Sequence, residues 1–215
     1  MNPADDRPPV VVLISGNGSN LQALIDAADD GEPFRVCGVI SNRPGVRGLQ
    51  RASAAGIPSL VLDHTGFPDR VSFDAALADA IEGFAPRLVV LAGFMRILTD
   101  DFVNRFAGRM LNIHPSLLPE FQGLHTHRRA LQQGVSEHGA SVHFVTAELD
   151  GGPVIAQARL AVEADDTEST LAARVLQREH QLLPLVVAWF ATGRLQLRGN
   201  RVWFDNAPLQ APLQC

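Results

Sequence analysis

Asn112 and His114 stand close together at the end of a short apolar segment, residues 110–114, that stops at a proline. The segment has the composition of a β-strand, and side chains on a strand alternate between its two faces. Leu111 and Ile113 are therefore expected on one face, and Asn112 and His114 on the other. A hydrogen-bond donor beside a titratable imidazole has the chemistry to stabilise a developing oxyanion and to move a proton.

The imidazole of His114 needs a partner that fixes its tautomer and favours its charged form, and a carboxylate does both. Asp150, in the run Leu-Asp-Gly-Gly-Pro at residues 149–153, is the best candidate by residue type. The alternative is a structural turn, because Asp-Gly is a common turn dipeptide. The residues alone favour the turn and leave the pairing with His114 open.

The glycine-rich run Ser-Gly-Asn-Gly-Ser-Asn at residues 15–20 joins an apolar strand to a helical pattern. Ligands of open α/β sheets bind outside the carboxyl ends of strands, and amides at a helix N-terminus favour a phosphate. The run is not a dinucleotide fingerprint, because the third glycine is missing and Ser-Asn at residues 41–42 replaces the expected acid. It also lacks the end of a Walker loop. A plain turn capped by Ser19 or Asn20 explains the run equally well.

A second loop, Phe-Met-Arg-Ile-Leu at residues 94–98, follows the apolar segment 88–91, which is expected to be a buried strand. This loop would lie at the same edge of the sheet as the glycine-rich run. Flat apolar side chains beside free backbone groups suit an aromatic heterocycle. A hydrophobic loop that closes the core is an equally good interpretation.

His125 and His127 raise the question of a metal site, but no carboxylate or cysteine stands beside them, so no metal is predicted. His143 is expected to be a hydrogen-bonded core histidine in a strand. The remaining candidates are expected on the surface or on solvated helix faces: His64, His138, His180 and Glu179.

The composition excludes several kinds of chemistry. All 18 basic residues are arginine, so neither a lysine Schiff base nor a phosphate-loop lysine is available, and tyrosine is absent. The formal charge of −5 argues against broad nucleic-acid binding. Cys37 and Cys215 lack metal-ligand spacing, and we expect a cytoplasmic protein without a structural disulfide. The N-terminus is polar and no apolar run is long enough for a bilayer, so no membrane partner is expected.

Strand and helix patterns alternate through the first half of the chain, which predicts an α/β protein with a Rossmann-like, doubly wound, mostly parallel sheet. The last third has hairpin character, so mixed C-terminal strands are expected, in one continuous domain over residues 1–215. Pro184 predicts a break or kink in the last helix. The expected strands are 9–15, 35–40, 59–62, 88–91, 110–114, 141–145, 154–161, 195–198 and 201–204, and the clearest helices are 48–55, 72–84 and 167–192.

Several motifs together carry a resemblance to a known family. Asn-Ile-His-Pro-Ser-Leu-Leu-Pro at residues 112–119, with the run at 149–153, resembles the signature of the folate-dependent formyltransferases. Three more runs narrow the resemblance to one branch of this family: Ile-Ser-Gly-Asn-Gly-Ser-Asn-Leu at 14–21, Gly-Phe-Met-Arg-Ile-Leu at 93–98 and Gly-Leu-His-Thr-His at 123–127. They are similar to the members that formylate the amine of 5'-phosphoribosylglycinamide in de novo purine biosynthesis. The resemblance spans about residues 10–204.

The resemblance implies a formyltransferase fold and 10-formyltetrahydrofolate as the co-substrate, without a metal. It implies a phosphate-binding half over about residues 9–107, a catalytic and folate-binding half over about 108–204, and a monomer or homodimer that acts on small molecules. The implied catalytic residues are Asn112, His114 and Asp150. The implied substrate-binding residues are Gly18, Ser19 and Asn20 for the phosphate and Glu179 for the ribose. The implied folate-binding residues are Arg70, Met95, Arg96, Ile97, Leu98, Thr146, Ala147, Glu148, Leu149 and Asp150.

Three other functions use parts of the same pattern. Methionyl-tRNA formyltransferase shares the Asn-x-His core but is expected to carry a further RNA-binding domain, and this chain is acidic. Formyltetrahydrofolate hydrolase also shares the core and is expected to carry a regulatory domain. A non-catalytic nucleotide-binding protein would use only the glycine-rich run, and its function would survive the loss of His114.

Overall fold

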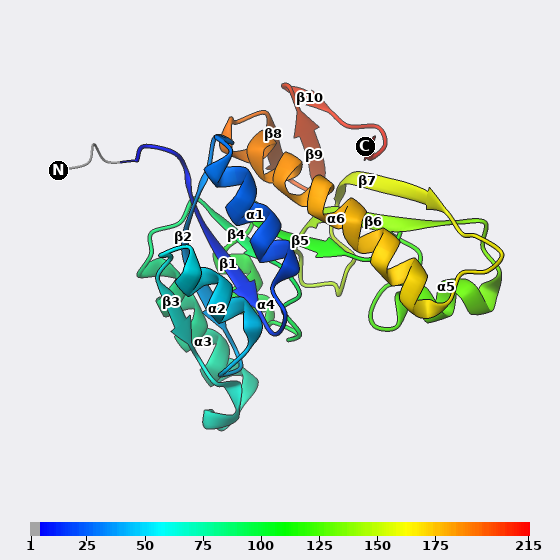
Figure 1. The fold of residues 1–215 in the computed structure, drawn as a ribbon. Coiled ribbons are helices and arrows are strands. Elements are labelled where there is room, and N and C mark those ends of the chain that lie inside the picture. Colours follow the sequence, from blue (N-terminus) through cyan, green and yellow to red (C-terminus); the bar gives the residue numbers. More distant parts are fainter. Residues whose placement is uncertain (1–4) are drawn as a thin grey trace.

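An eight-stranded sheet forms the centre of the computed structural model, which describes residues 5–215 (Figure 1). Its strand order is β11-β7-β6-β5-β4-β1-β2-β3. Strands β1 to β5 are parallel, whereas β6 pairs antiparallel with both β5 and β7. The bounds are β1 (Pro9–Ile14), β2 (Arg35–Ser41), β3 (Ser59–Val61), β4 (Leu88–Leu91), β5 (Met110–His114), β6 (Glu137–Phe144), β7 (Val154–Ala161) and β11 (Leu213–Gln214). The predicted α/β, mostly parallel, mixed sheet is confirmed.

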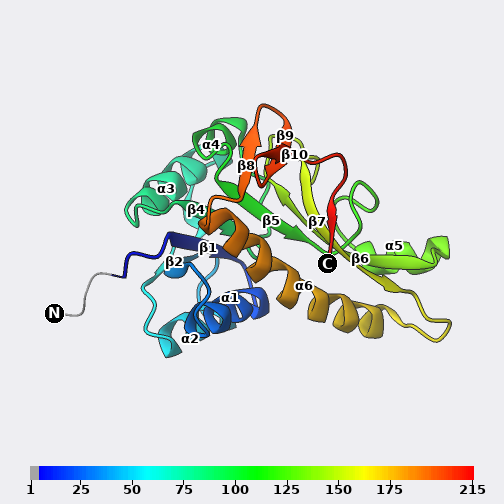
Figure 2. The ribbon, with the colours of Figure 1, turned by 90° about the horizontal axis from the view of Figure 1, so that it is seen from above.

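Helices cover both faces of the sheet, as the continuous apolar strands require (Figure 2). Alternate residues of β1 point into two separate cores: Val10 and Val12 pack with α1 and α6, and Val11 and Leu13 with α3 and α4. The bounds are α1 (Ser19–Asp29), α2 (Arg47–Ala54), α3 (Arg70–Glu82), α4 (Asp100–Arg105), α5 (Thr126–Gln133), α6 (Glu168–Ala191) and a 3₁₀ turn, η1 (His64–Gly66).

The C-terminal hairpin forms at the predicted residues but does not join the main sheet. Strands β8 (Leu195–Arg198), β9 (Arg201–Phe204) and β10 (Ala207–Pro208) make a separate three-stranded sheet. The mixed part of the main sheet comes instead from β6 and β7. Strand β6 begins at Glu137 rather than at residue 141, because its N-terminal half continues to pair with β7.

A break or a kink was predicted at Pro184, and the break is wrong, because helix α6 runs through the proline without interruption. Leu182 and Leu183 before the proline, and Val186 and Val187 after it, are all buried in the core. Packing on both sides outweighs the roughly 3 kcal/mol that an interior proline costs a helix.

No helix within residues 5–215 combines the length and apolar character needed to cross a bilayer.

Candidate active site

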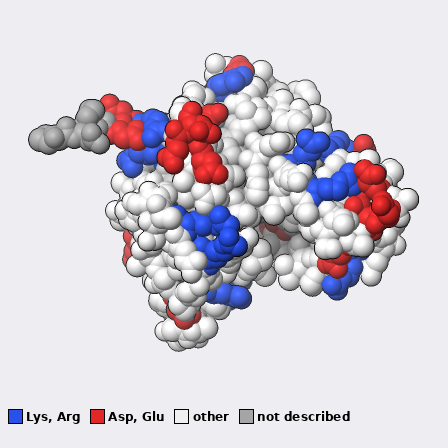
Figure 3. All heavy atoms as spheres, in the orientation of Figure 1, with Lys and Arg blue, Asp and Glu red and all other residues white. Residues whose placement is uncertain are grey.

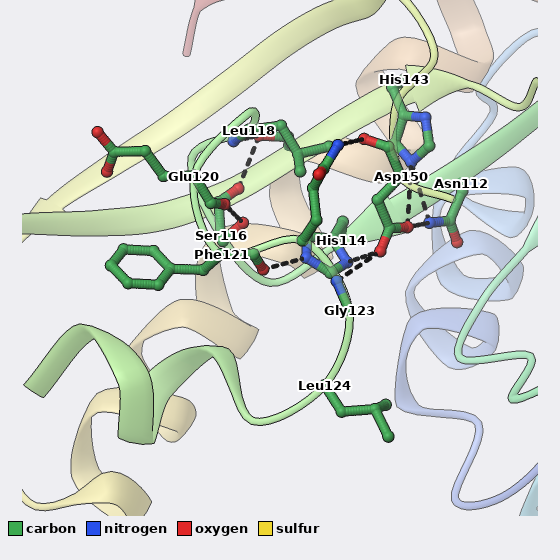
Figure 4. A network of polar contacts seen from close by, with 12 residues as sticks. Asn112, His114, Ser116, Leu118, Glu120, Phe121, Gly123, Leu124, His143 and Asp150 are labelled. Atoms are coloured by element: carbon green, nitrogen blue, oxygen red, sulfur yellow. Dashed lines mark hydrogen bonds and ion pairs between the residues drawn. The ribbon is translucent and has the colours of Figure 1, made fainter. Parts of the chain in front are cut away.

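Asn112 and His114 lie at the carboxyl end of β5 and share one face of the strand, as their spacing predicted. The turn between β6 and β7 brings Asp150 to them (Figure 4). One Asp150 carboxylate oxygen, Oδ2, lies 3.4 Å from His114 Nδ1, and the other, Oδ1, lies 3.4 Å from Asn112 Nδ2. The His114 and Asp150 side chains are only 7% and 10% exposed. The structure therefore brings the three predicted catalytic residues together in a site largely closed to water.

Asp150 is also the turn residue that its sequence suggested. Its φ of 49° is left-handed, a conformation that Asp tolerates better than most residues. Two residues later, a Cβ on Gly152 would lie 1.8 Å from the backbone oxygen of Phe144, so only glycine fits. Close packing of this turn against β6 fixes the position from which the carboxylate reaches His114.

The loop between β5 and α5 closes the other side of the site, which the sequence did not predict. The Gly123 N–H donates to Asp150 Oδ2 at 2.9 Å, and the Phe121 carbonyl lies 3.0 Å from His114 Nε2. Arg129 of α5 donates to the Gln122 carbonyl at 2.6 Å and holds the loop in place. The only sequence signal for this role is the length of the loop, since long loops are often functional.

Both ring nitrogens of His114 therefore face an acceptor. Nδ1 faces the Asp150 carboxylate and Nε2 faces the Phe121 carbonyl. A doubly protonated imidazolium donates to both groups, whereas either neutral tautomer leaves one acceptor without a proton. The geometry of the site suits the charged ring.

His143 is the functional candidate that sequence reasoning missed. It is buried as predicted, but it also faces Asn112 across the β5–β6 pair. Burial lowers the pKa of His143, so the ring is neutral. Its Nδ1 donates to the Phe144 carbonyl at 2.9 Å, which leaves Nε2 to accept from Asn112 Nδ2 at 3.1 Å. This contact orients the Asn112 amide so that its NH₂ group faces His143 and Asp150.

The expectation of a surface or helical position for His138 is wrong. His138 lies in β6 and is buried, and its Nε2 is 3.2 Å from His127 Nδ1. Burial lowers the pKa of His138 to about 4, and it also lowers the pKa of His127. Within residues 5–215, no three His, Cys, Asp or Glu side chains are grouped as metal ligands would be.

The glycine-rich run forms the turn between β1 and α1. Gly18, with φ 69°, is the N-cap residue and no side chain caps the helix, so the alternative of a turn capped by Ser19 or Asn20 is wrong. The first amides of α1 are thus left without a capping side chain, which is the arrangement that binds anions. A pocket beside them is lined by residues 15–20, 92–93 and 95. A Cβ on Gly18 would lie 2.7 Å from the Gly48 Cα, so α2 packs against this loop too closely for any larger residue.

The sequence suggested a solvated helix face for Glu179, but the residue is buried. It is 7% exposed, and its Oε2 accepts a hydrogen bond of 2.6 Å from Asn20 Nδ2 in the first turn of α1. Burial raises the pKa of Glu179, and the bond from Asn20 opposes that rise. The packing of α6 against α1 thereby brings an acid to the predicted phosphate loop.

Glu179→Gln is expected to raise the free energy of unfolding by about 1 kcal/mol at pH 8. The raised pKa means that folding favours the neutral carboxyl. The stabilisation that the neutral Glu179 carboxyl gives the folded protein is complete below pH 4.5, the ordinary pKa of this side chain. It is lost as the pH rises through the higher pKa that Glu179 has in the folded protein. Glutamine stays neutral and still accepts from Asn20. Urea unfolding at pH 8 and pH 4 measures the difference, which should disappear at pH 4. Equal stability of the two proteins at pH 8 would contradict the prediction, and Glu120→Gln, at an exposed position, is the control.

A second pocket lies under the loop that follows β4. It is lined by Leu91, Phe94, Arg96, Ile97, Leu98, Val103, Asn112, His143, Val145, Thr146, Ala147, Glu148, Leu149 and Asp150. Two predicted folate-binding residues lie elsewhere. Met95 lines the pocket of the glycine-rich loop, and Arg70 is the exposed first residue of α3, where Asp69 caps the helix and starts it two residues earlier than predicted.

The second pocket combines apolar walls with backbone amides that are unpaired within residues 5–215. Its walls are mostly apolar. Among residues 5–215, no backbone hydrogen bond uses the N–H of Arg96, Ile97 or Leu98. Free amides beside apolar walls suit a ligand that is flat and polar at its edge. On the face shown in Figure 3 the charges of both signs are scattered, and the surface is hollowed between the two halves of the molecule.

Together the fold and the site define an α/β protein in which an amide, an imidazole and a carboxylate meet at one sheet edge. Residues 9–187 match the family described as formyl transferase. The chain therefore belongs to the formyl transferase family, and it is a group-transferring enzyme.

Individual relatives narrow the family further. The chain is 54% identical over 201 residues to the phosphoribosylglycinamide formyltransferase of Escherichia coli K12, covering 93% of this chain and 95% of that protein. A solved phosphoribosylglycinamide formyltransferase of Coxiella burnetii superposes with a TM-score of 0.94 at 50% identity, covering 97% and 99% of the two chains. The human trifunctional purine biosynthetic protein adenosine-3 is 46% identical over 89% of this chain and 19% of its own length. Within its family the chain groups with the phosphoribosylglycinamide formyltransferases of purine biosynthesis, which confirms the resemblance predicted from its motifs.

Proposed function

We propose that this enzyme moves the formyl group of 10-formyltetrahydrofolate to the amine of 5'-phosphoribosylglycinamide by direct attack. The observation that supports this most is the order of three neighbouring strands, β1, β4 and β5. Their carboxyl ends carry the phosphate loop, the loop at residues 94–98 and the pair Asn112 and His114. A phosphate, a heterocycle and a reacting carbonyl can therefore be held side by side, which supplies the proximity that a two-substrate transfer needs.

The reaction needs no covalent enzyme intermediate. The neutral amine attacks the formyl carbon, a carbon–nitrogen bond forms, and the carbonyl oxygen becomes an oxyanion. Asn112 Nδ2 donates to that oxygen, using the N–H that reaches Asp150 over the longer distance of 3.4 Å. The bond from the formyl carbon to the folate nitrogen then breaks, and the proton lost by the amine reaches that nitrogen.

His114 and Asp150 are proposed to act as a unit. The charged imidazole turns the N–H that faces the Phe121 carbonyl to the oxyanion, keeps its other N–H on Asp150, and carries the proton, alone or through a water molecule. Asp150 keeps the ring charged and aimed, and it is itself held by the Gly123 N–H. Enclosure of both side chains strengthens these electrostatic contacts.

The substrates are assigned to the two pockets. The amides of Gly18, Ser19 and Asn20 hold the phosphate, and Glu179 accepts from the ribose. The folate ring occupies the pocket formed by residues 94–98 and 145–150, with Arg70 outside it as a cation for the carboxylate tail of the folate. This division supports a phosphate-binding half over about residues 9–107 and a catalytic half over about 108–204, in one domain. We further propose a cytoplasmic monomer or homodimer that acts on small molecules.

The experiment is to mix the protein with 5'-phosphoribosylglycinamide and a 10-formylfolate, and to follow deformylation of the folate. Release that depends on the amine is expected. Absence of amine-dependent release would overturn the proposal, and release without the amine would favour a hydrolase. His114→Ala provides the comparison, because a protein that only bound nucleotides would keep its function without this residue.

A further inference from the structure

Ser15 joins the two substrate pockets at the end of β1. Its N–H donates to the Gly93 carbonyl at 3.1 Å, and its hydroxyl accepts from the Met95 N–H at 2.7 Å. Both partners belong to the segment that leaves β4, whereas Ser15 is the first residue of the glycine-rich loop. One residue thus ties the start of the loop at residues 95–98 to the start of the predicted phosphate loop.

Asn42 fixes the direction of the hydrogen bonds that the Ser15 hydroxyl makes. The Ser15 hydroxyl donates its single proton to Asn42 Oδ1 at 2.6 Å, which leaves its lone pairs to accept from Met95. The two side chains are 5% and 1% exposed, so water does not replace either bond. Asn42 follows β2, where a dinucleotide-binding fold carries an acid for the ribose. In this protein Asn42 occupies that position, and its side chain binds the Ser15 hydroxyl.

The loop at residues 95–98 is held by hydrogen bonds at its two ends, and between them by Arg96 over the Phe73 ring and Leu98 against the core. Met95 and Ile97 are 57% and 59% exposed, and little packing holds them. The N–H of the first loop residue, Met95, is bound by Ser15, and the N–H directly after the loop, on Thr99, is bound by the buried Asp74 carboxylate at 2.6 Å. Two buried side chains, one at each end, therefore fix a loop whose other amides bond to no backbone group of residues 5–215.

We propose that Ser15, held by Asn42, is a positioning residue that sets the folate-side loop relative to the phosphate loop. The inference rests on the proposed function, which assigns folate to this loop. Loss of the Ser15 hydroxyl removes the partner of the Met95 N–H and leaves Asn42 Oδ1 buried without its donor, so the loop at 95–98 moves. The amides of the phosphate loop do not use the hydroxyl and keep their geometry.

Ser41 offers a matched control. It is buried at the end of the neighbouring strand β2, and its hydroxyl likewise donates to one backbone carbonyl and accepts from one backbone N–H, both of Arg43. Neither of these bonds involves the loop at 95–98. Ser41→Ala therefore repeats the burial and the lost bonds of Ser15→Ala without touching the folate side.

The test compares Ser15→Ala, Ser15→Thr and Ser41→Ala with the natural protein. In Ser15→Ala, the KM for the formylfolate and the Kd of a folate analogue with carbon in place of N10 should rise about tenfold. The KM for phosphoribosylglycinamide should rise less than the folate KM, because Ser15 and Met95 line the phosphate pocket but its amides do not use the hydroxyl. Hydrogen exchange of the Met95 amide should become at least about tenfold faster. Ser15→Thr keeps the hydroxyl and should restore slow exchange, and Ser41→Ala should change none of these values.

Unchanged Met95 exchange and folate KM in Ser15→Ala would overturn the inference, and so would equal losses for both substrates. If Ser15→Ala does not fold, Asn42→Ala tests the same bond and should also speed Met95 exchange. Failure of the natural protein to bind the folate analogue would overturn the proposed function instead. Met95 exchange would still decide whether Ser15 positions the loop.

Discussion

Asp150→Asn is expected to lower kcat by about a thousandfold, or roughly 4 kcal/mol of barrier. Asparagine has the size of aspartate and also tolerates the left-handed backbone, so the turn with φ 49° persists. The negative charge of the side chain is lost. Three donors surround the carboxylate, on His114, Asn112 and Gly123. An amide has one acceptor oxygen, so its NH₂ group meets a donor and the His114 ring loses its anionic partner.

Asp205→Asn is the matched control for this prediction. Asp205 also has a φ of 49° in a turn, and its carboxylate pairs with Arg194 at 2.7 Å, far along the chain from the site. Its kcat should stay within about twofold of the natural value, because only an exposed ion pair is lost. Steady-state kinetics with both substrates saturating measures the two variants. An Asp150→Asn enzyme within about tenfold of the natural kcat would remove Asp150 from the mechanism.

Asn112→Ala is expected to lower kcat by a factor of about 10² to 10³, or roughly 3 kcal/mol, the usual cost of removing an oxyanion donor. The amide has little role in ground-state binding, so the KM values should change much less than kcat. The truncation also removes the donor to His143 Nε2 at 3.1 Å. Urea unfolding of the variant therefore accompanies the kinetics, so that a stability loss is separated from the loss of rate.

Asn112→Asp separates the donor role of this residue from its volume. The carboxylate fills the same space but has no N–H for an oxyanion, and it faces the Asp150 carboxylate. We expect it to be at least as inactive as Asn112→Ala. Near-normal turnover in either variant would refute the oxyanion role of Asn112.

The elements that the sequence predicted well are those with a local signal. The apolar runs at β4 and β5 matched the predicted bounds, and Thr99 is a helix cap of a common residue type, with its hydroxyl accepting from the Phe102 N–H at the start of α4. Alternation along β5 was enough to place Asn112 and His114 on one face of the strand. These features depend on residues that are neighbours in the chain, and period and capping are visible at that range.

The failures arose where a long-range contact decided the outcome. Pro184 suggested a break, but core packing around it keeps α6 continuous. Glu179 has the sequence context of a solvated helix face, but α1 covers it. A local pattern carries no information about which element packs against it, so burial of an isolated polar residue is not visible in the sequence.

The residue chemistry, the strand that presents Asn112 and His114, and the resemblance to the formyltransferases therefore follow from the order of the amino acids alone. The folded chain was needed to show that Asp150 reaches His114, that His143 orients Asn112, and that the Gly123 amide closes the site. Side-chain alternation is a property of a single strand, so a short stretch of sequence contains it. Register between β5 and β6, and the closure of the loop after β5, instead depend on the packing of the whole chain.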